Sequence, residues 1–223
     1  MGQVGNLRPI GNRPAEFHEN ISGRRHFVSV IESLRRHLPH RYAAGKAIFL
    51  TWRLHGTLPQ GRSFPEKLTS GQAFVAMDSL LDNAGTGTRF FCRPEIASIV
   101  VEAILRREQR HYELHAWVVM PNHVHLLITP LVEVSKVMQS LKRFTARECN
   151  RILGRTGQPF WQDESYDRLV RDDAEFSRIG RYIEMNPVRA GLVSAPEEFL
   201  WSSGRPITIR PQVTNLPHVN LAG

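Results

Sequence analysis

The order of apolar and polar positions predicts strands alternating with helices from about residue 47 onward. Residues 47–56 (AIFLTWRLHG) are rich in β-branched and aromatic side chains and end at a Gly-Thr-Leu-Pro turn, which is typical of a strand. Residues 94–110 repeat apolar side chains every 3.6 residues or so, with Pro94 in the first turn, and this predicts a helix. Residues 57–93 contain many turn formers and only weak helical patterning, so we expect an insertion or an irregular connection there.

A β-hairpin and a long helix are predicted next. Residues 112–120 (YELHAWVVM) and 123–129 (HVHLLIT) each have the composition of a strand, and Pro121-Asn122 between them favours a tight turn. Residues 132–153 place apolar side chains on one side and a row of arginines on another, which indicates an amphipathic helix.

The last elements are a short strand, predicted over residues 166–170, and a final helix. Asp172 and Glu175 have the spacing of a capping box that opens this helix. We expect the helix to end near Asn186, because Pro187 disfavours helical geometry in the residue before it.

These elements predict an α+β fold, in which an antiparallel sheet has helices packed on one face. A length of 223 residues suits one domain with terminal extensions better than two domains. We expect an N-terminal arm over residues 1–40, with a short helix at 27–38, then a domain over 41–204. Residues 205–223 are expected to form an irregular, Pro-rich tail.

The charge balance of the chain indicates which class of molecule it binds. Lys and Arg number 29 against 21 Asp and Glu, so the formal net charge is +8, which favours a polyanion such as nucleic acid. A protein that is basic without any such partner is the alternative. No apolar run is long enough for a membrane span, the start of the chain lacks a secretory apolar region, and the two cysteines have no metal-ligand spacing. We therefore expect a cytoplasmic protein with no membrane partner.

The sharpest local motif is His123-Val124-His125. In a strand, residues two apart project to the same face, so both imidazoles can share a divalent cation. The alternative is a pair of half-exposed histidines on a solvated sheet face.

A second pair of polar residues lies on the final helix. Tyr182 and Asn186 are four apart and therefore stack on one helical face. Asn186 offers an oxygen that could be a third ligand for a hard cation, and Tyr182 offers a phenol that becomes a nucleophile only when activated. An ordinary core tyrosine and a helix-terminal asparagine are the alternatives.

A basic row lies on the long helix. Arg143, Arg147 and Arg151 repeat every four residues, with Lys136 and Lys142 nearby, and this spacing could follow a phosphate backbone. A solvated helix face with incidental ion pairs explains the same spacing.

Three stretches in this order and at these distances resemble one known family. HAWVVMPNHVHLLITP, FWQDESYDRLVRDDAEF and RYIEMNPVRAGLV closely resemble the REP-associated tyrosine transposases, which belong to the single-tyrosine HUH (His-hydrophobic-His) superfamily. The resemblance runs from about residue 40 to residue 204. It implies a ferredoxin-like sheet whose central strand carries the two histidines, with the tyrosine helix packed beside it.

The resemblance also implies roles for individual residues. His123, His125 and Asn186 would bind Mg²⁺ or Mn²⁺, and Tyr182 would be the nucleophile, with Tyr166 as the rival tyrosine. The implied function is a transposase: a metal-dependent endonuclease and strand transferase that acts on single-stranded, hairpin-forming repeat DNA through a 5′-phosphotyrosine intermediate.

Two residues outside the basic row are also candidates for DNA contacts, and other functions are compatible with the sequence. Arg171 and Trp161 are further candidates for DNA binding, the protein is expected as a monomer or homodimer, and a nucleoid location is expected. A domesticated DNA-binding protein of the same fold without efficient cleavage is the main alternative. A hydrolase that uses a water nucleophile is another, whereas an RNA-binding module is disfavoured because no strand has the aromatic pattern of an RNP motif.

Overall fold

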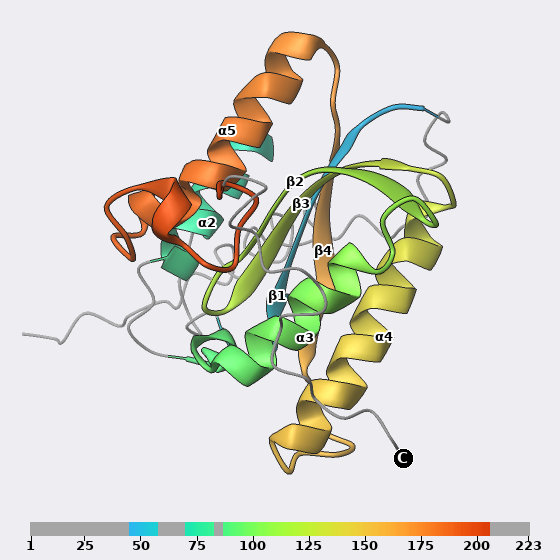
Figure 1. The fold of residues 1–223 in the computed structure, drawn as a ribbon, viewed down its shortest axis with the longest axis vertical. Helices are drawn as coiled ribbons and strands as arrows, with labels where there is room; N and C mark the ends of the chain where they lie inside the picture. The colour runs from blue at the N-terminus through green and yellow to red at the C-terminus, as the bar shows by residue number, and fades with distance from the viewer. Residues whose placement is uncertain (1–44, 58–69, 83–86, 206–223) are drawn as a thin grey trace, which may run out of the picture.

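A computed structural model describes residues 45–57, 70–82 and 87–205 (Figure 1). The predicted arm over 1–40, its short helix at 27–38, and all but the first residue of the tail over 205–223 lie outside the described residues, so the domain boundaries stay predictions. None of the described helices is both long enough and apolar enough to cross a bilayer.

The described residues form one antiparallel sheet of four strands in the order β2-β3-β1-β4. The strands are β1 (Ile48–Leu54), β2 (Tyr112–Val119), β3 (His123–Pro130) and β4 (Trp161–Leu169). Helix α3 (Pro94–Leu105) is the last helix in the connection from β1 to β2, and helix α4 (Val134–Ile152) connects β3 to β4. This order is that of the ferredoxin-like fold, which confirms the predicted α+β class and places β3 between two neighbours.

The fourth strand is longer than predicted from the sequence. It begins at Trp161, five residues before the predicted start at Tyr166. Strand β4 lies at the sheet edge and pairs only with β1. The run Gln162–Asp163–Glu164 consists of polar residues alone, so it carries no apolar alternation by which a strand could be predicted.

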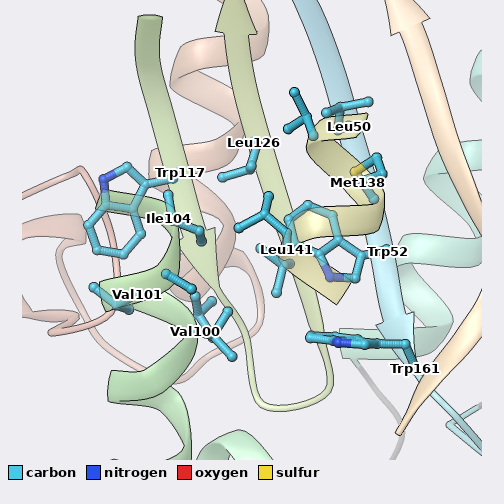
Figure 2. Close-up of a cluster of buried hydrophobic side chains, with 14 of the residues drawn as sticks. Leu50, Trp52, Val100, Val101, Ile104, Trp117, Leu126, Met138, Leu141 and Trp161 are labelled. Carbon is cyan, nitrogen blue, oxygen red and sulfur yellow. The ribbon is translucent and has the colours of Figure 1, made fainter. Parts of the chain in front are cut away.

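One face of the sheet is covered by α3 and α4 and holds the larger core (Figure 2). Alternate residues of β1 and β3, such as Leu50, Trp52 and Leu126, point to this face because strand side chains alternate. They pack against apolar residues of both helices, among them Val100, Val101, Ile104, Met138 and Leu141.

The opposite face is also covered by helices, which corrects the prediction that helices pack on one face only. Helices α2 (Ser70–Asp82) and α5 (Asp173–Arg189) pack there, where Phe74 and Ile183 contact a second cluster that includes Phe49 and Leu127. These two sheet residues are apolar and need burial on the face that α3 and α4 leave open. Figure 1 shows α2 and α5 together on that side.

Helix α2 also corrects the prediction of an irregular connection over residues 57–93. It forms over Ser70–Asp82 within that stretch and buries Phe74 and Leu81. Its few apolar anchors lie among small and polar residues, so packing against the sheet stabilises this helix more than its own pattern indicates.

Helix α5 begins as predicted but ends later. The Asp172 side chain accepts a hydrogen bond from the Glu175 backbone N–H at 2.7 Å, which confirms the N-cap. The helix then continues through Pro187 to Arg189, contrary to the predicted end near Asn186. Pro187 removes only its own N–H bond, and the ladder resumes where the Ala190 N–H donates to the Asn186 carbonyl at 2.9 Å.

A buried carboxylate fastens the start of α5 to the sheet. The Glu175 side chain is 2% exposed and pairs with Arg168 of β4 and with Arg171. Its Oε2 also accepts the Arg171 backbone N–H at 2.9 Å. The Arg171 hydrogen bond, followed by the backbone bond and the Arg168 charge, outweighs burial and lowers the pKa of Glu175 to about 2.

We predict that Glu175→Gln lowers the free energy of unfolding by about 1–2 kcal/mol at neutral pH, because two guanidiniums lose their carboxylate. The folded pKa lies below the ordinary value of 4.5. The stabilisation is therefore present above pH 4.5 or so and is lost as the pH falls toward 2. Urea unfolding at several pH values measures this difference, and a gap between variant and wild type that does not narrow in acid would contradict the assignment.

Candidate metal centre and tyrosine site

The two histidines of β3 lie on the sheet face that α2 and α5 cover. His123 and His125 are both 0% exposed, and their Nε2 atoms are 3.1 Å apart. Between them, Val124 points into the opposite core. The alternation predicted from the sequence is therefore present, and the alternative of half-exposed histidines is wrong.

Hydrogen bonds on the far side of each ring fix how the imidazoles are presented. His123 Nδ1 lies 2.6 Å from Asn122 Oδ1, while Asn122 Nδ2 donates to the Leu81 carbonyl at 2.9 Å. Since a carboxamide oxygen only accepts, Nδ1 of His123 carries the proton and Nε2 is an open electron-pair donor. His125 Nδ1 lies 2.7 Å from the Thr51 hydroxyl, its cross-strand neighbour on β1.

Helix α2 brings a carboxylate to the same point. Asp78 Oδ1 lies 3.1 Å from His125 Nε2 and 3.4 Å from His123 Nε2, and the residue is 1% exposed. One ligand atom from each of these three residues lies within 4.8 Å of the others. Asp78, His123 and His125 therefore form a buried group that could hold a metal ion.

Unpaired atoms favour a cation in this group. Asp78 Oδ1, Asp82 Oδ1 and Asn186 Oδ1 are buried and accept no hydrogen bond. A buried oxygen without a partner costs free energy that a bound cation would recover. The separations between the three ligand atoms are close to the roughly 3 Å that neighbouring ligands of a small divalent ion adopt. The residues present thus fit a metal.

The protonation states also suit metal binding. Burial, followed by repulsion from His125, lowers the pKa of His123 to about 3, so this imidazole is neutral at pH 7. Burial alone would raise the pKa of Asp78, but the two histidines and the Tyr182 hydrogen bond together hold it well below its ordinary value. Burial and the nearby Asp78 charge raise the pKa of Asp82 to about 7. A neutral imidazole and an ionised carboxylate are the forms that bind metal.

Tyr182 of α5 is joined to this group through Asp78. Its hydroxyl donates to Asp78 Oδ2, the oxygen next to the one that faces the histidines. The phenol ring lies 5.8 Å from the His125 ring between centroids. Burial, and then the charge of Asp78, raise the pKa of Tyr182 above its ordinary value. The phenol therefore keeps its proton and needs a nearby acceptor or cation before it can react.

Arg189, the last residue of α5, covers the outer side of the tyrosine. Its guanidinium carbon lies 4.7 Å from the centroid of the Tyr182 ring. A hydrogen bond from Arg189 and its positive charge act to lower the pKa of Tyr182, although burial and Asp78 outweigh them. Arg189 is exposed, so a cation stands at the solvent side of the phenol.

Asn186 is brought to the site as predicted, but with its nitrogen nearest the ligands. Asn186 Nδ2 donates to Asp78 Oδ2 at 3.1 Å and lies 3.4 Å from His125 Nε2. Its role as a metal ligand stays a prediction. The rival Tyr166 is on β4, where its ring stacks on Phe74 at 4.5 Å between centroids.

Some of the predicted DNA-binding residues are buried or held by other residues, and the rest are exposed. Trp161 is 7% exposed and its indole N–H donates to Thr145, so it belongs to the core and cannot stack on a base without opening that core. Lys142 donates to the Gln162 and Asp163 carbonyls of β4, and Arg171 pairs with Glu175. Arg143, Arg147, Arg151 and Lys136 are exposed along α4.

Two carboxylates of the site, Asp78 and Asp82, are not among the residues predicted from the sequence. They are four apart on α2, one turn from each other, and both are largely buried. A pair of aspartates in a weakly amphipathic segment is the only signal for them in the sequence, and it does not indicate that they approach β3.

Part of the chain is similar in sequence to known transposases. Residues 92–186 match the family model described as "Transposase IS200 like". That stretch contains both histidines, Tyr182 and Asn186, and it excludes α2. Over 97 residues the chain is 27% identical to the REP-associated tyrosine transposase of Escherichia coli K12. Over this stretch the chain is similar to the REP-associated tyrosine transposases.

Two further matches are to proteins that are also named REP-associated tyrosine transposases. A Haemophilus influenzae protein named for the same group is 26% identical over 108 residues. These alignments cover 44% and 43% of this chain and only 57% and 61% of the two relatives. A solved REP-associated tyrosine transposase bound to a REP hairpin is 19% identical, with 84% of this chain and 91% of that chain covered and a TM-score of 0.49.

We predict that Asp78→Asn weakens Mn²⁺ binding by about tenfold or more, because the amide removes the charge of a buried ligand. Isothermal titration of the full chain with MnCl₂ measures the change. His115→Ala is the matched control, since His115 is bound to Thr129 and does not belong to the group. Equal affinity for Asp78→Asn and wild type would show that the carboxylate is not a ligand.

Proposed function

We propose that this chain cuts and rejoins single-stranded DNA by transesterification, with Tyr182 as the nucleophile. The supporting observation is the hydrogen bond from the Tyr182 hydroxyl to Asp78, whose other oxygen faces His123 and His125. A phenol whose oxygen is one carboxylate away from a metal-binding group has the arrangement that tyrosine-dependent strand transfer requires. Names of the curated relatives, which include tyrosine transposases, support the same reaction.

The metal would be held by His123, His125 and Asp78, with Asn186 as the further ligand that the family resemblance implies. A divalent ion there, Mg²⁺ or Mn²⁺, would polarise the scissile phosphate as a Lewis acid. Carboxylate and carboxamide oxygens suit these hard ions, and two imidazoles favour Mn²⁺ of the pair.

The chain's own residues carry out the remaining steps. The Tyr182 oxygen attacks phosphorus, so an O–P bond forms as the bond from phosphorus to the 3′-oxygen breaks. Asp78 Oδ2, which already accepts the phenol hydrogen bond, orients the phenol oxygen beside the metal group, and the proton that leaves the phenol is released to solvent. The products are a 5′-phosphotyrosine and a strand with a free 3′-hydroxyl, which takes up one proton. Since the number of phosphodiester bonds is conserved, a second 3′-hydroxyl can reverse the step without ATP.

Arg189 would act on the phosphate rather than on the metal. Its guanidinium stands beside the phenol at the exposed end of the site, where a phosphate attacked by Tyr182 would lie. A planar fork of N–H donors suits non-bridging phosphate oxygens and stabilises the negative charge that develops on them.

Charge, sequence similarity and the burial of the phenol support the proposed substrate class. The net charge of +8 favours a polyanion. The relatives are named for an association with REP sequences, and the family resemblance implies hairpin-forming repeats cut at unpaired bases. A backbone attacked by a half-buried phenol also has to be locally single-stranded to reach it.

We predict that Tyr182→Phe abolishes formation of a covalent protein–DNA adduct, because the attacking oxygen is removed. The probe is a single-stranded oligonucleotide library with a fixed hairpin stem and randomised flanking bases, incubated with the full chain and MnCl₂. Adducts that survive denaturation are resolved on a gel, and the modified peptide is mapped by mass spectrometry.

Tyr166→Phe is the matched control and should form the adduct as wild type does. Strand cleavage that persists in Tyr182→Phe would assign the reaction to a water nucleophile. Binding of the library without any adduct in the wild-type chain would favour the alternative of a DNA-binding protein without efficient cleavage.

We also predict that Arg189→Ala slows adduct formation by about 10²-fold under single-turnover conditions, since one donor to the developing charge is lost. Arg189→Lys should recover part of the rate, because it keeps the charge without the fork. Manganese affinity should stay at the wild-type value in both variants. A rate loss that follows weaker metal binding would contradict a role at the phosphate.

A further inference from the structure

One oxygen of the Asp82 carboxylate is buried without a hydrogen-bond partner. The side chain is 7% exposed, and its Oδ1 atom accepts no hydrogen bond. This oxygen lies 4.0 Å from Nε2 of His123, the nitrogen whose electron pair is open because the ring proton is on Nδ1. A buried oxygen that gains no hydrogen bond has lost its hydration without compensation. Packing alone therefore does not account for a carboxylate at this position.

Asp82 and Asp78 approach the same imidazole nitrogen from one helix. They are four residues apart in α2, so they lie on one face of it, a turn from each other. Asp78 Oδ1 lies 3.4 Å from Nε2 of His123, and Asp82 Oδ1 lies 4.0 Å from the same atom. An ion bound at this nitrogen would therefore have an oxygen of each carboxylate beside it.

Asn122 fixes the end of α2 that carries Asp82. Its Nδ2 donates to the carbonyl of Leu81, the preceding residue, at 2.9 Å. Its Oδ1 lies 2.6 Å from Nδ1 of His123, and the residue is 2% exposed. One buried side chain thus holds both the backbone beside Asp82 and the ring of His123. Hydrogen-bond partners of this kind orient the ligands of metal sites.

The two carboxylates oppose each other when no cation is present. Like charges repel strongly in a buried site, and the neutral imidazole of His123 does not offset them. The two negative charges of Asp78 and Asp82 would cancel the charge of one divalent ion. A buried ion is tolerated when its surroundings compensate its charge in this way.

Asn186 differs from Asp82 in the atom that it directs at the group. Its Nδ2, rather than its oxygen, lies 3.1 Å from Asp78 Oδ2 and 3.4 Å from Nε2 of His125. Asp82 already directs an oxygen without a partner toward His123. A carboxylate oxygen is also a stronger ligand for a hard cation than a carboxamide, because it carries charge.

We propose that Asp82 is a further ligand of the divalent cation that the buried group of Asp78 and the two histidines would hold. The proposal rests on the proposed function, in which a metal ion occupies this group, and it adds a second carboxylate to the ligands. Two carboxylates with two imidazoles suit Mn²⁺, which accepts both oxygen and nitrogen ligands. Helix α2, which lies outside the stretch that matches the transposase family model, would then supply half of these four ligands.

Asp82→Asn tests the proposal, with Glu184→Gln as the charge-matched control. Glu184 accepts a hydrogen bond from Ser203 and does not belong to the metal-binding group. Isothermal titration of the full chain with MnCl₂ measures the affinity for the ion. Thermal unfolding in EDTA measures the stability of the metal-free chain.

We expect Asp82→Asn to bind Mn²⁺ about tenfold or more weakly than Glu184→Gln does. The midpoint of its unfolding in EDTA should equal or exceed that of the wild type, because the variant removes the repulsion between two carboxylates. A carboxylate with a structural role alone gives the opposite pair of results. A lower midpoint together with unchanged Mn²⁺ affinity would therefore overturn the proposal.

Asp82→Cys separates contact with the ion from an effect of charge. A thiolate is a soft ligand, so a cysteine that touches the ion should raise the ratio of Cd²⁺ to Mn²⁺ affinity by about tenfold over wild type. It should also add an ultraviolet thiolate-to-cadmium absorption band, for which the wild-type chain with Cys92 and Cys149 is the control. Equal loss of affinity for both ions, with no added band, would show that Asp82 acts through charge alone and would overturn the proposal.

Failure of this proposal and failure of the proposed function give different results. Mn²⁺ binding that depends on Asp82, in a chain that forms no DNA adduct, would leave the Asp82 assignment standing and remove the cleavage function. Adduct formation at Tyr182 in a chain that binds no Mn²⁺ would overturn the Asp82 assignment and leave the nucleophile in place.

Discussion

The site depends on one buried carboxylate. Asp78 is 1% exposed, faces two imidazoles with one oxygen and accepts the hydrogen bonds of Tyr182 and Asn186 with the other. A buried charge is tolerated only when its surroundings compensate it, so α2, β3 and α5 are obliged to meet at this residue. The same requirement explains why histidines, carboxylate and phenol form one cluster.

The two faces of the sheet differ: one carries the main apolar core and the other carries the candidate site. Its α3–α4 face is an apolar core around residues such as Trp52, Trp117 and Leu126. Its other face mixes a smaller apolar cluster with the polar group at His123 and His125. Because a strand alternates sides, β3 contributes to both at once, and the rigid core fixes the direction of the two imidazoles. Ligands placed on a central strand need little reorganisation to bind a cation.

Local patterns were sufficient to predict the parts of the site that lie within single elements. The alternation of β3 predicts that His123 and His125 share a face, and helical spacing predicts that Tyr182 and Asn186 do. The α+β class follows from the same patterns, whereas the ferredoxin-like sheet with the histidine strand in its interior is what the family resemblance implies. The structure confirms both.

The features that sequence did not predict depend on contacts between distant residues. Asp78 and Tyr182 are 104 residues apart, and no periodicity in α2 indicates that it meets α5. The continuation of α5 past Pro187 depends on hydrogen bonds formed beyond the proline, and the core position of Trp161 depends on packing against α4. In each case the local sequence allows more than one conformation or position, and tertiary packing determines which one forms.

Diffraction from crystals grown with MnCl₂, recorded at the manganese absorption edge, shows whether these three side chains bind the ion beside the phenol. We expect one strong anomalous peak about 2.0–2.3 Å from Nε2 of His123, Nε2 of His125 and an oxygen of Asp78, with the Tyr182 hydroxyl beside it. A peak that avoids these atoms, or a Tyr182 side chain directed away from them in the metal-bound protein, would contradict this expectation.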